Sequence, residues 1–342
     1  MSVRVPRIVI YGTGQFGGYI TRFALQKGWT IVAAYNRAGP KVGQDLGVLA
    51  GVDPIGVIVQ DCDSARFDTV EADLGIVTLS DRLARNWPAY ARLLGAGLNV
   101  LCHGAESYYP WGSNAVVAQQ IDALAKQNGV TFTGGGIWDM SRIWAGILAG
   151  GPCTEMESLH HHSLTDAGCV GKALATITGI GMSLAEYEKQ VIGSASLLSG
   201  FYGTIPQIVM DALGYTLTKA SERLEPIILD EPIESAVLGR VIPAGYCVGT
   251  RIVAEVETAE GVPARAEMEM RQFRPGEYEY MEWAINGLPG TRVQARRNNT
   301  AHATAACLFN RIPDVIAAQP GIVLVSQMAP LRHTARLRAQ AR

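Results

Sequence analysis

The first half of the chain alternates short apolar runs with amphipathic segments, a pattern typical of a parallel β-sheet covered by helices. The apolar runs predict strands at residues 7–12, 29–35, 73–80, 98–104 and 129–136. Between them, apolar residues recur at helical spacing over residues 15–27, 84–95 and 114–129. Because nearly continuous apolar strands are buried on both faces, we predict an α/β fold whose first domain, 1–150, is a doubly wound parallel (Rossmann) sheet.

The pattern changes near Gly150-Gly151-Pro152, after a further helix predicted at 137–149. Longer stretches of alternating polar and apolar residues predict strands at 240–261, 264–273, 277–287 and 291–297. Turns at Glu260-Gly261 and Asn286-Gly287 would join such strands in antiparallel order. With helices near 183–191 and 203–221, residues 151–299 are predicted to form an α+β domain with a mainly antiparallel sheet, for substrate binding and dimerisation. Residues 300–342 begin as a helix and are expected to pack back on the first domain.

Composition narrows the choice of partners and compartment. The formal net charge is −2, so no strong field favours binding to nucleic acid or to an anionic membrane. No apolar run approaches the roughly 18 residues of a membrane span. Six scattered cysteines without a Cys-x-x-Cys pair predict free thiols in a reducing cytoplasm. The run His160-His161-His162 is not expected to bind metal, because neighbours on a strand point to opposite faces.

A glycine-rich turn carries the clearest functional signal. Residues Gly12 to Gly17 read G-x-G-x-x-G and lie between the first predicted strand and the first helix, which is the context of a dinucleotide site. The first glycine permits a tight turn, the second lets the pyrophosphate approach, and the third lets helix and strand pack closely. The whole turn is therefore a candidate cofactor site: Gly12, Thr13, Gly14, Gln15, Phe16 and Gly17.

The end of the second strand favours NADP. Sites that select NAD usually carry an acid here, which bonds the ribose 2′-hydroxyl. This chain has Asn36 and Arg37 instead, and an arginine can pair with a 2′-phosphate. Because Asn36 can still bond a free ribose hydroxyl, we expect NADP to be preferred and NAD to remain possible.

Three further strand ends are expected to meet the cofactor, since ligands of doubly wound sheets lie outside the carboxyl ends of the strands. The candidate contacts there are Thr78, Ser80, His103, Gly104, Ala105 and Gly135. Glu106 follows directly, so its carboxylate should lie where the nicotinamide and the substrate meet. Tyr108 and Trp111 come next and would form an apolar wall beside it.

The usual proton donors for carbonyl reduction are missing. The sequence has no Tyr-x-x-x-Lys on a suitable helix, no zinc ligand set and no His–Asp pair with a clamping arginine. A single carboxylate suits an imine, because a protonated imine accepts hydride without a strong acid on oxygen. The reaction needs a base for the ammonium proton and an acid for the departing hydroxyl. We assign both roles to Glu106.

Four segments together resemble the family of 2,4-diaminopentanoate dehydrogenase and the native amine dehydrogenases: GTGQFGG (12–18), YNRAGPKVGQDLG (35–47), CHGAE (102–106) and NRIPDVIAAQPG (310–321). That family is similar in fold to dihydrodipicolinate reductase. The resemblance implies a Rossmann domain, an α+β domain, a homodimer, and reversible conversion of amines to ketones or aldehydes with NAD(P). It places the catalytic glutamate at Glu106 and adds Asn310 as a cofactor contact.

The chain departs from dihydrodipicolinate reductase in the segment HHHSLTDAGCVGKA (160–173). Where that reductase has a lysine this chain has Leu164, and Gly168 to Gly171 replace Pro-Ser-Gly-Thr. A site for a dicarboxylate has thereby lost its cation. We therefore expect a ketone or aldehyde without a required carboxylate, used with ammonia or a small amine. The candidates for the substrate pocket are Tyr108, Trp138, Trp144, His160 and Tyr202.

Two other functions remain open from the residues alone. One is a different NAD(P)-dependent imine or carbonyl reductase on the same fold. The other is a dinucleotide sensor without catalysis, although no basic stripe or DNA-binding element supports it. The sequence does not specify the physiological amine.

Overall fold

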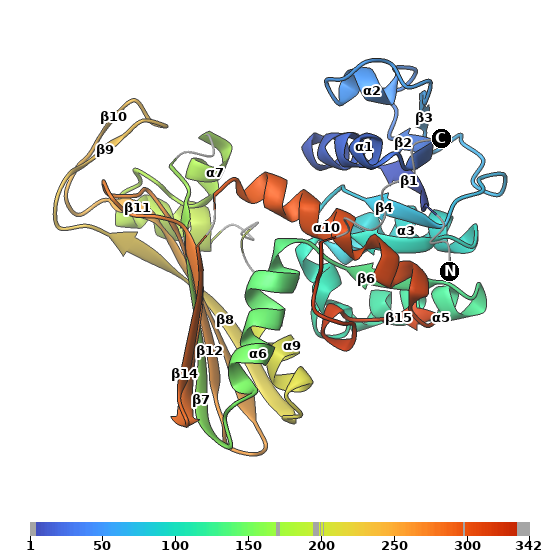
Figure 1. Cartoon of the computed structure of the whole chain (residues 1–342). Coiled ribbons are helices and arrows are strands. Elements are labelled where there is room, and N and C mark those ends of the chain that lie inside the picture. Colours follow the sequence, from blue (N-terminus) through green and yellow to red (C-terminus); the bar gives the residue numbers. More distant parts are fainter. Residues whose placement is uncertain are drawn as a thin grey trace. The chain divides into compact units, whose positions relative to one another are not determined.

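Seven parallel strands form the first sheet, in the order β15-β6-β5-β4-β1-β2-β3. In chain order they are β1 (Arg7–Tyr11), β2 (Thr30–Asn36), β3 (Val59–Asp61), β4 (Leu74–Val77), β5 (Asn99–Cys102), β6 (Thr131–Gly134) and β15 (Gly321–Ile322). The structure is a computed structural model that describes residues 5–168, 172–193, 198, 200, 202–296 and 298–333. The predicted doubly wound sheet is confirmed (Figure 1).

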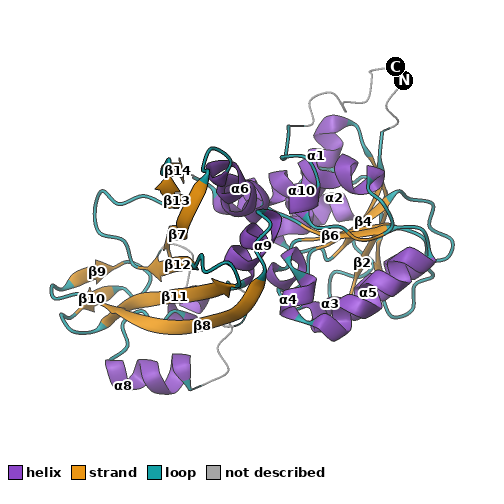
Figure 2. Cartoon of the chain, turned by 90° about the horizontal axis from the view of Figure 1, so that it is seen from below, coloured by secondary structure: helices purple, strands orange, loops and turns teal. Residues whose placement is uncertain are grey.

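Helices cover both faces of this sheet, because successive strand residues point to opposite sides. On β1, Ile8 and Ile10 belong to one apolar core, and Val9 and Tyr11 belong to the other. The first core includes residues of α1 (Gln15–Lys27), α2 (Leu46–Leu49) and α10 (Thr300–Ala317). The second includes residues of α3 (Leu83–Gly95) and α5 (Ala115–Gln127). Figure 2 shows the two groups of helices on opposite sides of the strands, with α4 (Pro110–Ser113) beside α3 and α5.

The chain divides into two compact units. The first contains residues 1–140 and 299–342, so α10 and β15 return to the sheet that the N-terminal half builds. Residues Leu308, Phe309 and Ile312 of α10 are buried in its core. The second unit contains residues 141–298, and the boundary falls inside the π-helical turn Asp139–Trp144.

A six-stranded mixed sheet forms the second unit, in the order β14-β13-β7-β12-β11-β8. Its strands are β7 (Glu155–Asp166), β8 (Leu217–Ile228), β11 (Cys247–Thr258), β12 (Ala264–Arg271), β13 (Tyr280–Leu288) and β14 (Thr291–Arg296). Only the β7–β12 pair is parallel, so the predicted mainly antiparallel sheet is confirmed. A separate ribbon pairs β9 (Ile233–Ser235) with β10 (Arg240–Ile242).

Short helices accompany the second sheet. They are α6 (Ala145–Gly150), α7 (Lys172–Ile177), α8 (Leu184–Tyr187) and α9 (Thr204–Ala212), and the π-helical turn Glu188–Ile192 extends α8. Helices α6 and α9 lie along the same sheet in Figure 1, where α6 contacts β13 and β14, and α9 contacts β8, β11 and β12. The other face of the sheet carries the charged side chains of β8, β11 and β12.

Three predicted boundaries in the second unit are wrong. The helix predicted at 203–221 ends at Ala212, because Gly214 takes a positive φ and the following residues pair with β11 as β8. The strand predicted at 240–261 is interrupted by a turn after Pro243, which separates β10 from β11. Asn286-Gly287 does not form a hairpin turn. It lies inside β13, where the pairing with β7 shifts by one residue.

Two further observations concern the described cysteines and the apolar length of the helices. The described cysteines Cys62, Cys102, Cys153, Cys247 and Cys307 are free thiols. Cys169 lies outside the described residues. Among the described residues, none of the helices is both long and apolar enough to span a bilayer.

A buried ion pair ties α10 to the rest of the first unit. Both nitrogens of one edge of the Arg311 guanidinium donate to the Asp139 carboxylate, at 2.7 and 2.8 Å. Both side chains are wholly buried. The remaining nitrogen of Arg311 donates to Asp314 and to the carbonyl of Ala329. The pair therefore fixes the start of the π-helical turn against α10.

We predict that Asp139→Leu lowers the free energy of unfolding by about 3–5 kcal/mol, because it leaves the Arg311 guanidinium buried without its carboxylate. The double variant Asp139→Leu with Arg311→Met should recover most of this loss, since no buried charge remains. Urea denaturation of the two variants and the parent measures both effects. A single variant as stable as the parent, or a double variant no better than the single, contradicts the prediction.

Candidate functional site

The glycine-rich turn has the backbone that a dinucleotide site requires. Gly12 adopts φ +105°, and a β-carbon there would lie 2.7 Å from the carbonyl oxygen of Thr78. The Thr78 hydroxyl in turn donates to the carbonyl of Gly12 at 2.8 Å. A β-carbon at Gly17 would meet the same Gly12 carbonyl, whereas one at Gly14 would meet no atom within 4 Å. The turn is thus closely packed on the strand side and open above Gly14.

Several polar groups around this turn lack partners within the described residues. Gly14 begins α1 without a side-chain cap, so the N–H groups of the first turn remain available to a ligand. The hydroxyl of Thr13 and Nδ1 of His103 are buried and make no hydrogen bond in the described part of the chain. The ring of His103 lies 4.8 Å from that of Phe16. Burial lowers the pKa of His103, although Asp81 nearby raises it in part. The imidazole is therefore neutral at physiological pH.

The predicted contacts at the ends of β4 and β5 come together beside the turn. Gly104 packs so closely on the carbonyl of Ser80 that a β-carbon would lie 2.5 Å from it. The Ser80 hydroxyl donates to Asn86 of α3 at 3.0 Å. Ala105 is buried in the 3₁₀ turn Ala105–Tyr108. Gly135 follows β6, and its N–H donates to the carbonyl of Cys102 at the end of β5.

The loop after β2 contributes a lysine that sequence reasoning missed. Lys41 reaches back to the glycine-rich turn, and its ammonium donates to the carbonyl of Thr13 at 2.8 Å. Asn36 ends β2 half-buried, and Arg37 follows it with an exposed side chain. A signal was present, since Lys41 lies in the segment 35–47 that carries the family resemblance. Nothing in the sequence indicates that the Lys41 side chain reaches Thr13, which lies 28 residues earlier in the chain.

Glu106 lies at the same edge of the sheet, in a setting different from the predicted one. Its side chain accepts from Nη1 of Arg82 at 2.8 Å and from the backbone N–H of Leu83 at 2.7 Å. Leu83 is the first residue of α3, so the carboxylate caps that helix from another segment of the chain. The partners of Glu106 are thus a cation and a helix N-terminus rather than an apolar wall.

The aromatic residues after Glu106 differ in their burial. Tyr108 is buried and stacks on Trp138, with 5.3 Å between ring centroids. Its hydroxyl lies beside Gly136, where a β-carbon would come within 2.6 Å. Trp111 is 42% exposed. The Tyr108–Trp138 pair can still form a wall of a site in the first unit, but Trp111 is a surface residue.

In the second unit, His161 rather than His160 is the buried histidine of the pair. Neighbours on β7 alternate, so His161 is buried, with its ring centre 4.5 Å from that of Trp283, while His160 is exposed. His160 borders a cavity of about 450 Å³ with Lys219, Glu255 and Arg265, on the face of the sheet that bears the charges. His160 therefore lies on the face of the sheet opposite to His161 and Tyr202, and the structure does not bring His160 and Tyr202, two of the predicted pocket residues, together.

Tyr202 belongs to a buried polar cluster on the face of His161. Its hydroxyl lies 3.0 Å from that of Ser163 and donates to the carbonyl of Glu267. The guanidinium of Arg142 lies 5.1 Å from the centre of the Tyr202 ring, and one nitrogen donates to Ser163. Trp144 is half-buried at the end of the same π-helical turn. The spacing of His161 and Ser163 along one strand could have indicated this cluster.

Asn310 lies at the opposite end of α1 from the glycine-rich turn. With Phe23, Lys27 and His302 it lines a cavity of about 250 Å³ between α1 and α10. The last turn of α1, rather than the first, faces this residue. The structure therefore does not bring Asn310 together with the other predicted cofactor contacts.

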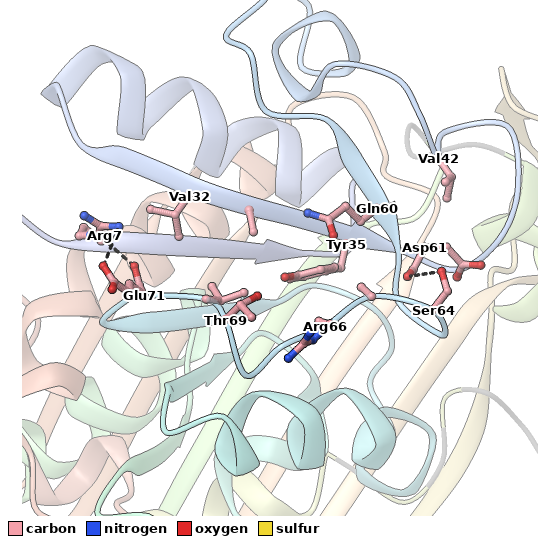
Figure 3. A pocket seen from close by; sticks show the side chains of 13 residues that line it. Arg7, Val32, Tyr35, Val42, Gln60, Asp61, Ser64, Arg66, Thr69 and Glu71 are labelled. Carbon is pink, nitrogen blue, oxygen red and sulfur yellow. Dashed lines mark hydrogen bonds and ion pairs between the residues drawn. The ribbon is translucent and has the colours of Figure 1, made fainter.

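A cavity of about 750 Å³ in the first unit contains none of the predicted site residues. It lies along β2 and β3 under the loop 62–72, as Figure 3 shows. Its charged groups pair locally: Arg7 with Glu71, and Arg66 with Asp68. The buried hydroxyl of Tyr35 makes no hydrogen bond within the described residues. Both arginines of this cavity are already paired, so the site at the strand ends remains the better candidate for an anionic dinucleotide.

Potential metal ligands come together at the end of β3. Within the described residues, the side chains that approach a metal-binding arrangement are Asp61, Cys62 and Asp63. The carboxylate of Asp63 already accepts from Arg92 at 2.6 Å. The three consecutive histidines do not converge, because β7 directs them to alternate faces.

Comparison with known proteins identifies the family. A model of the 2,4-diaminopentanoate dehydrogenase C-terminal domain matches residues 146–340, more than half of the chain. The chain belongs to this family. It is 26% identical to the 2,4-diaminopentanoate dehydrogenase of Acetoanaerobium sticklandii over 328 residues, which cover 92% of this chain and 91% of that protein.

Two other similarities agree with this membership. The solved structure of an amine dehydrogenase from Mycobacterium smegmatis superimposes with a TM-score of 0.84 and 29% identity, covering 97% of this chain and 98% of the other. A 4-hydroxy-tetrahydrodipicolinate reductase of Myxococcus xanthus is 29% identical over 195 residues, 55% of this chain and 66% of that protein. The resemblance found in the sequence is confirmed. The chain is an oxidoreductase of the amine dehydrogenase and diaminopentanoate dehydrogenase type, and dehydrogenases of this type imply a nicotinamide dinucleotide cofactor.

Proposed function

We propose that the chain is an amine dehydrogenase that prefers NADP, accepts NAD, and interconverts a ketone or aldehyde with the corresponding amine. The observation that carries this proposal is the carboxylate of Glu106. It lies in the segment that follows β5, and that segment packs against the end of β4 beside the glycine-rich turn. Ammonia or a small amine would be the nitrogen donor.

The residues at the strand ends fit a dinucleotide. The open space above Gly14, the uncapped first turn of α1 and the hydroxyl of Thr13 suit a pyrophosphate. Asn36 and Arg37 would bind the adenosine ribose and its 2′-phosphate, and Lys41 adds a second cation nearby. The remaining contacts would come from Thr78, Ser80 and the segment His103–Ala105. A bound nicotinamide dinucleotide supplies the hydride of the reaction.

Glu106 would manage the protons. Its carboxylate accepts a proton from an ammonium ion, which frees ammonia to add to the carbonyl carbon and form a carbinolamine. The resulting carboxylic acid returns the proton to the carbinolamine hydroxyl, which leaves as water. The product is a protonated imine, the form that accepts hydride and becomes the amine. In the opposite direction the carboxylate activates water for attack on the same imine.

The substrate need not carry a carboxylate. Leu164 occupies the place of the lysine of dihydrodipicolinate reductase, and its side chain is almost wholly buried. The buried cation of the second unit, Arg142, packs against the Tyr202 ring and the sulfur of Met268. Tyr202, Trp144 and the Tyr108–Trp138 pair are the remaining candidates for apolar contacts with an alkyl or cyclic ketone.

A homodimer is part of the proposal. The exposed face of the second sheet carries interlocked ion pairs between arginines and glutamates of β8, β11 and β12: Arg223, Arg251, Arg265, Arg271, Glu225, Glu255, Glu267 and Glu269. A surface with both signs of charge can complement itself across a two-fold axis. We propose this face as the contact between two copies.

Glu106→Gln should lower kcat for ammonium-dependent oxidation of NADPH by about 10²–10⁴-fold, because the amide cannot exchange a proton. Binding of NADPH, followed by fluorescence titration, should be preserved. The matched control is Glu188→Gln, which removes an exposed carboxylate and should be neutral. Turnover close to that of the parent would overturn the mechanism. Oxidation of NADPH by the ketone without ammonium would instead favour a carbonyl reductase.

Arg37→Ala should raise KM for NADPH by about tenfold and leave KM for NADH nearly unchanged, since only the 2′-phosphate loses a charge-assisted hydrogen bond. Lys41→Ala should raise KM for both cofactors, because Lys41 also holds the carbonyl of Thr13. Initial rates with each cofactor measure this, with exposed Lys189→Ala as the control. Equal effects of Arg37→Ala on the two cofactors would contradict the assignment.

A further inference from the structure

Arg82 links the proposed acid to the start of α3. One of its guanidinium nitrogens donates to Oε1 of Glu106, while the N–H of the next residue, Leu83, donates to Oε2. The two carboxylate oxygens therefore have separate donors that approach from adjacent positions of one segment. Charge-assisted hydrogen bonds of this kind are among the stronger ones in proteins. Together they fix the rotation of the carboxylate about its last bond.

The backbone around Glu106 is fastened to the same segment. The N–H of Glu106 donates to the carbonyl of Asp81 at 3.0 Å, and the N–H of Ala105 donates to the Asp81 carboxylate at 3.1 Å. Gly104 allows the close contact with Ser80 on which this pairing depends. Because the backbone is already held without Arg82, the guanidinium is not needed to keep the two segments together.

Glu106 keeps capacity for a substrate in this arrangement. A carboxylate has about four acceptor positions, and the described residues occupy one on each oxygen. Each oxygen can thus accept one more N–H or O–H donor. The side chain of Glu106 is 11% exposed and that of Arg82 is 31% exposed. The carboxylate is therefore sheltered, but not sealed from a small donor such as ammonium.

We propose that Arg82 is a positioning residue that holds the Glu106 carboxylate in the rotation that proton exchange with ammonia and water requires. This inference rests on the proposed function of Glu106. Arg82 itself need not touch the substrate. Its effect reaches the reaction through the direction of the Glu106 carboxylate.

The other ionisable groups around Glu106 do not obscure the effect of changing Arg82. Burial raises the pKa of Tyr90 on α3 and of Cys102 on β5, so both stay neutral near neutral pH. Burial lowers the pKa of His103, which is also neutral there. Asp81, in the loop after β4, is a second carboxylate that contacts the same segment. Its control is Asp81→Asn, which should not reproduce the effect of changing Arg82.

The test is the kinetics of ammonium-driven NADPH oxidation by Arg82→Gln, with kcat and the KM for ammonium measured separately. Loss of the guanidinium leaves Oε1 of Glu106 without its charge-assisted donor, so the carboxylate can rotate out of position. Misplacement of the carboxylate should lower kcat by about 10- to 100-fold. NADPH affinity and Tm, measured alongside, should stay close to those of the parent.

Two further variants separate positioning from folding. Arg82→Lys keeps the charge but not the planar guanidinium, so it should restore part of kcat. Arg85→Gln removes an exposed arginine of the same helix and should change nothing. A slow Arg82→Gln enzyme with a lowered Tm and no rescue by lysine would overturn the proposal, as would normal turnover.

Failure of this inference is distinct from failure of the proposed function. If Glu106→Gln is inactive while Arg82→Gln keeps the kcat of the parent, only the role of Arg82 falls. If Glu106→Gln stays active, the proton chemistry assigned to Glu106 falls and the role of Arg82 falls with it.

Discussion

The candidate site depends on close backbone contact between the carboxyl ends of β1, β4 and β5. Gly12 packs on the carbonyl of Thr78, and Gly104 packs on that of Ser80. Any side chain at either glycine would collide with a backbone oxygen, so the strand ends could not meet in this way. These two contacts place the glycine-rich turn beside the segment that carries Glu106. The turn would hold a dinucleotide, and the acid lies within the same small region.

The surroundings of Glu106 change how its chemistry is understood. An apolar wall would tune a carboxyl by removing water, whereas Arg82 and the first N–H of α3 tune it by stabilising the charge. A carboxylate that is ionised and fixed is suited to accepting a proton from ammonium. Burial favours the neutral forms of His103, Tyr90 and Cys102. The proposed acid–base role therefore falls on Glu106, which directly follows the candidate cofactor contacts His103 to Ala105.

Patterns of apolar residues and glycines in the sequence predicted the features that depend on short-range interactions. The period of apolar residues gave the strands and helices of the first unit within a few positions, because each strand is buried on both faces. The glycine-rich turn was recognisable because each of its three glycines meets a separate steric requirement. The second unit was harder. A strand with charged residues on its open side, such as β8, resembles a helix in sequence, and only its pairing with β11 decides the outcome.

Contacts between distant segments were not predictable. Arg82 and Glu106 are 24 residues apart, and Lys41 and Thr13 are 28 residues apart. No spacing in the sequence points to either pair. His160 was chosen over His161 because strand alternation does not say which face is buried. Asn310 was chosen by resemblance alone, and the structure places it at the far end of α1.

The most direct test of the central claim is a crystal structure of the protein with an oxidised dinucleotide and a simple amine. The account predicts that the amine nitrogen lies about 3 Å from an oxygen of Glu106, with Arg82 still bonded to the same carboxylate. It also predicts that the dinucleotide spans the glycine-rich turn and the ends of β4 and β5. An amine nitrogen bound out of reach of Glu106, for example at the Tyr202 cluster, would contradict it.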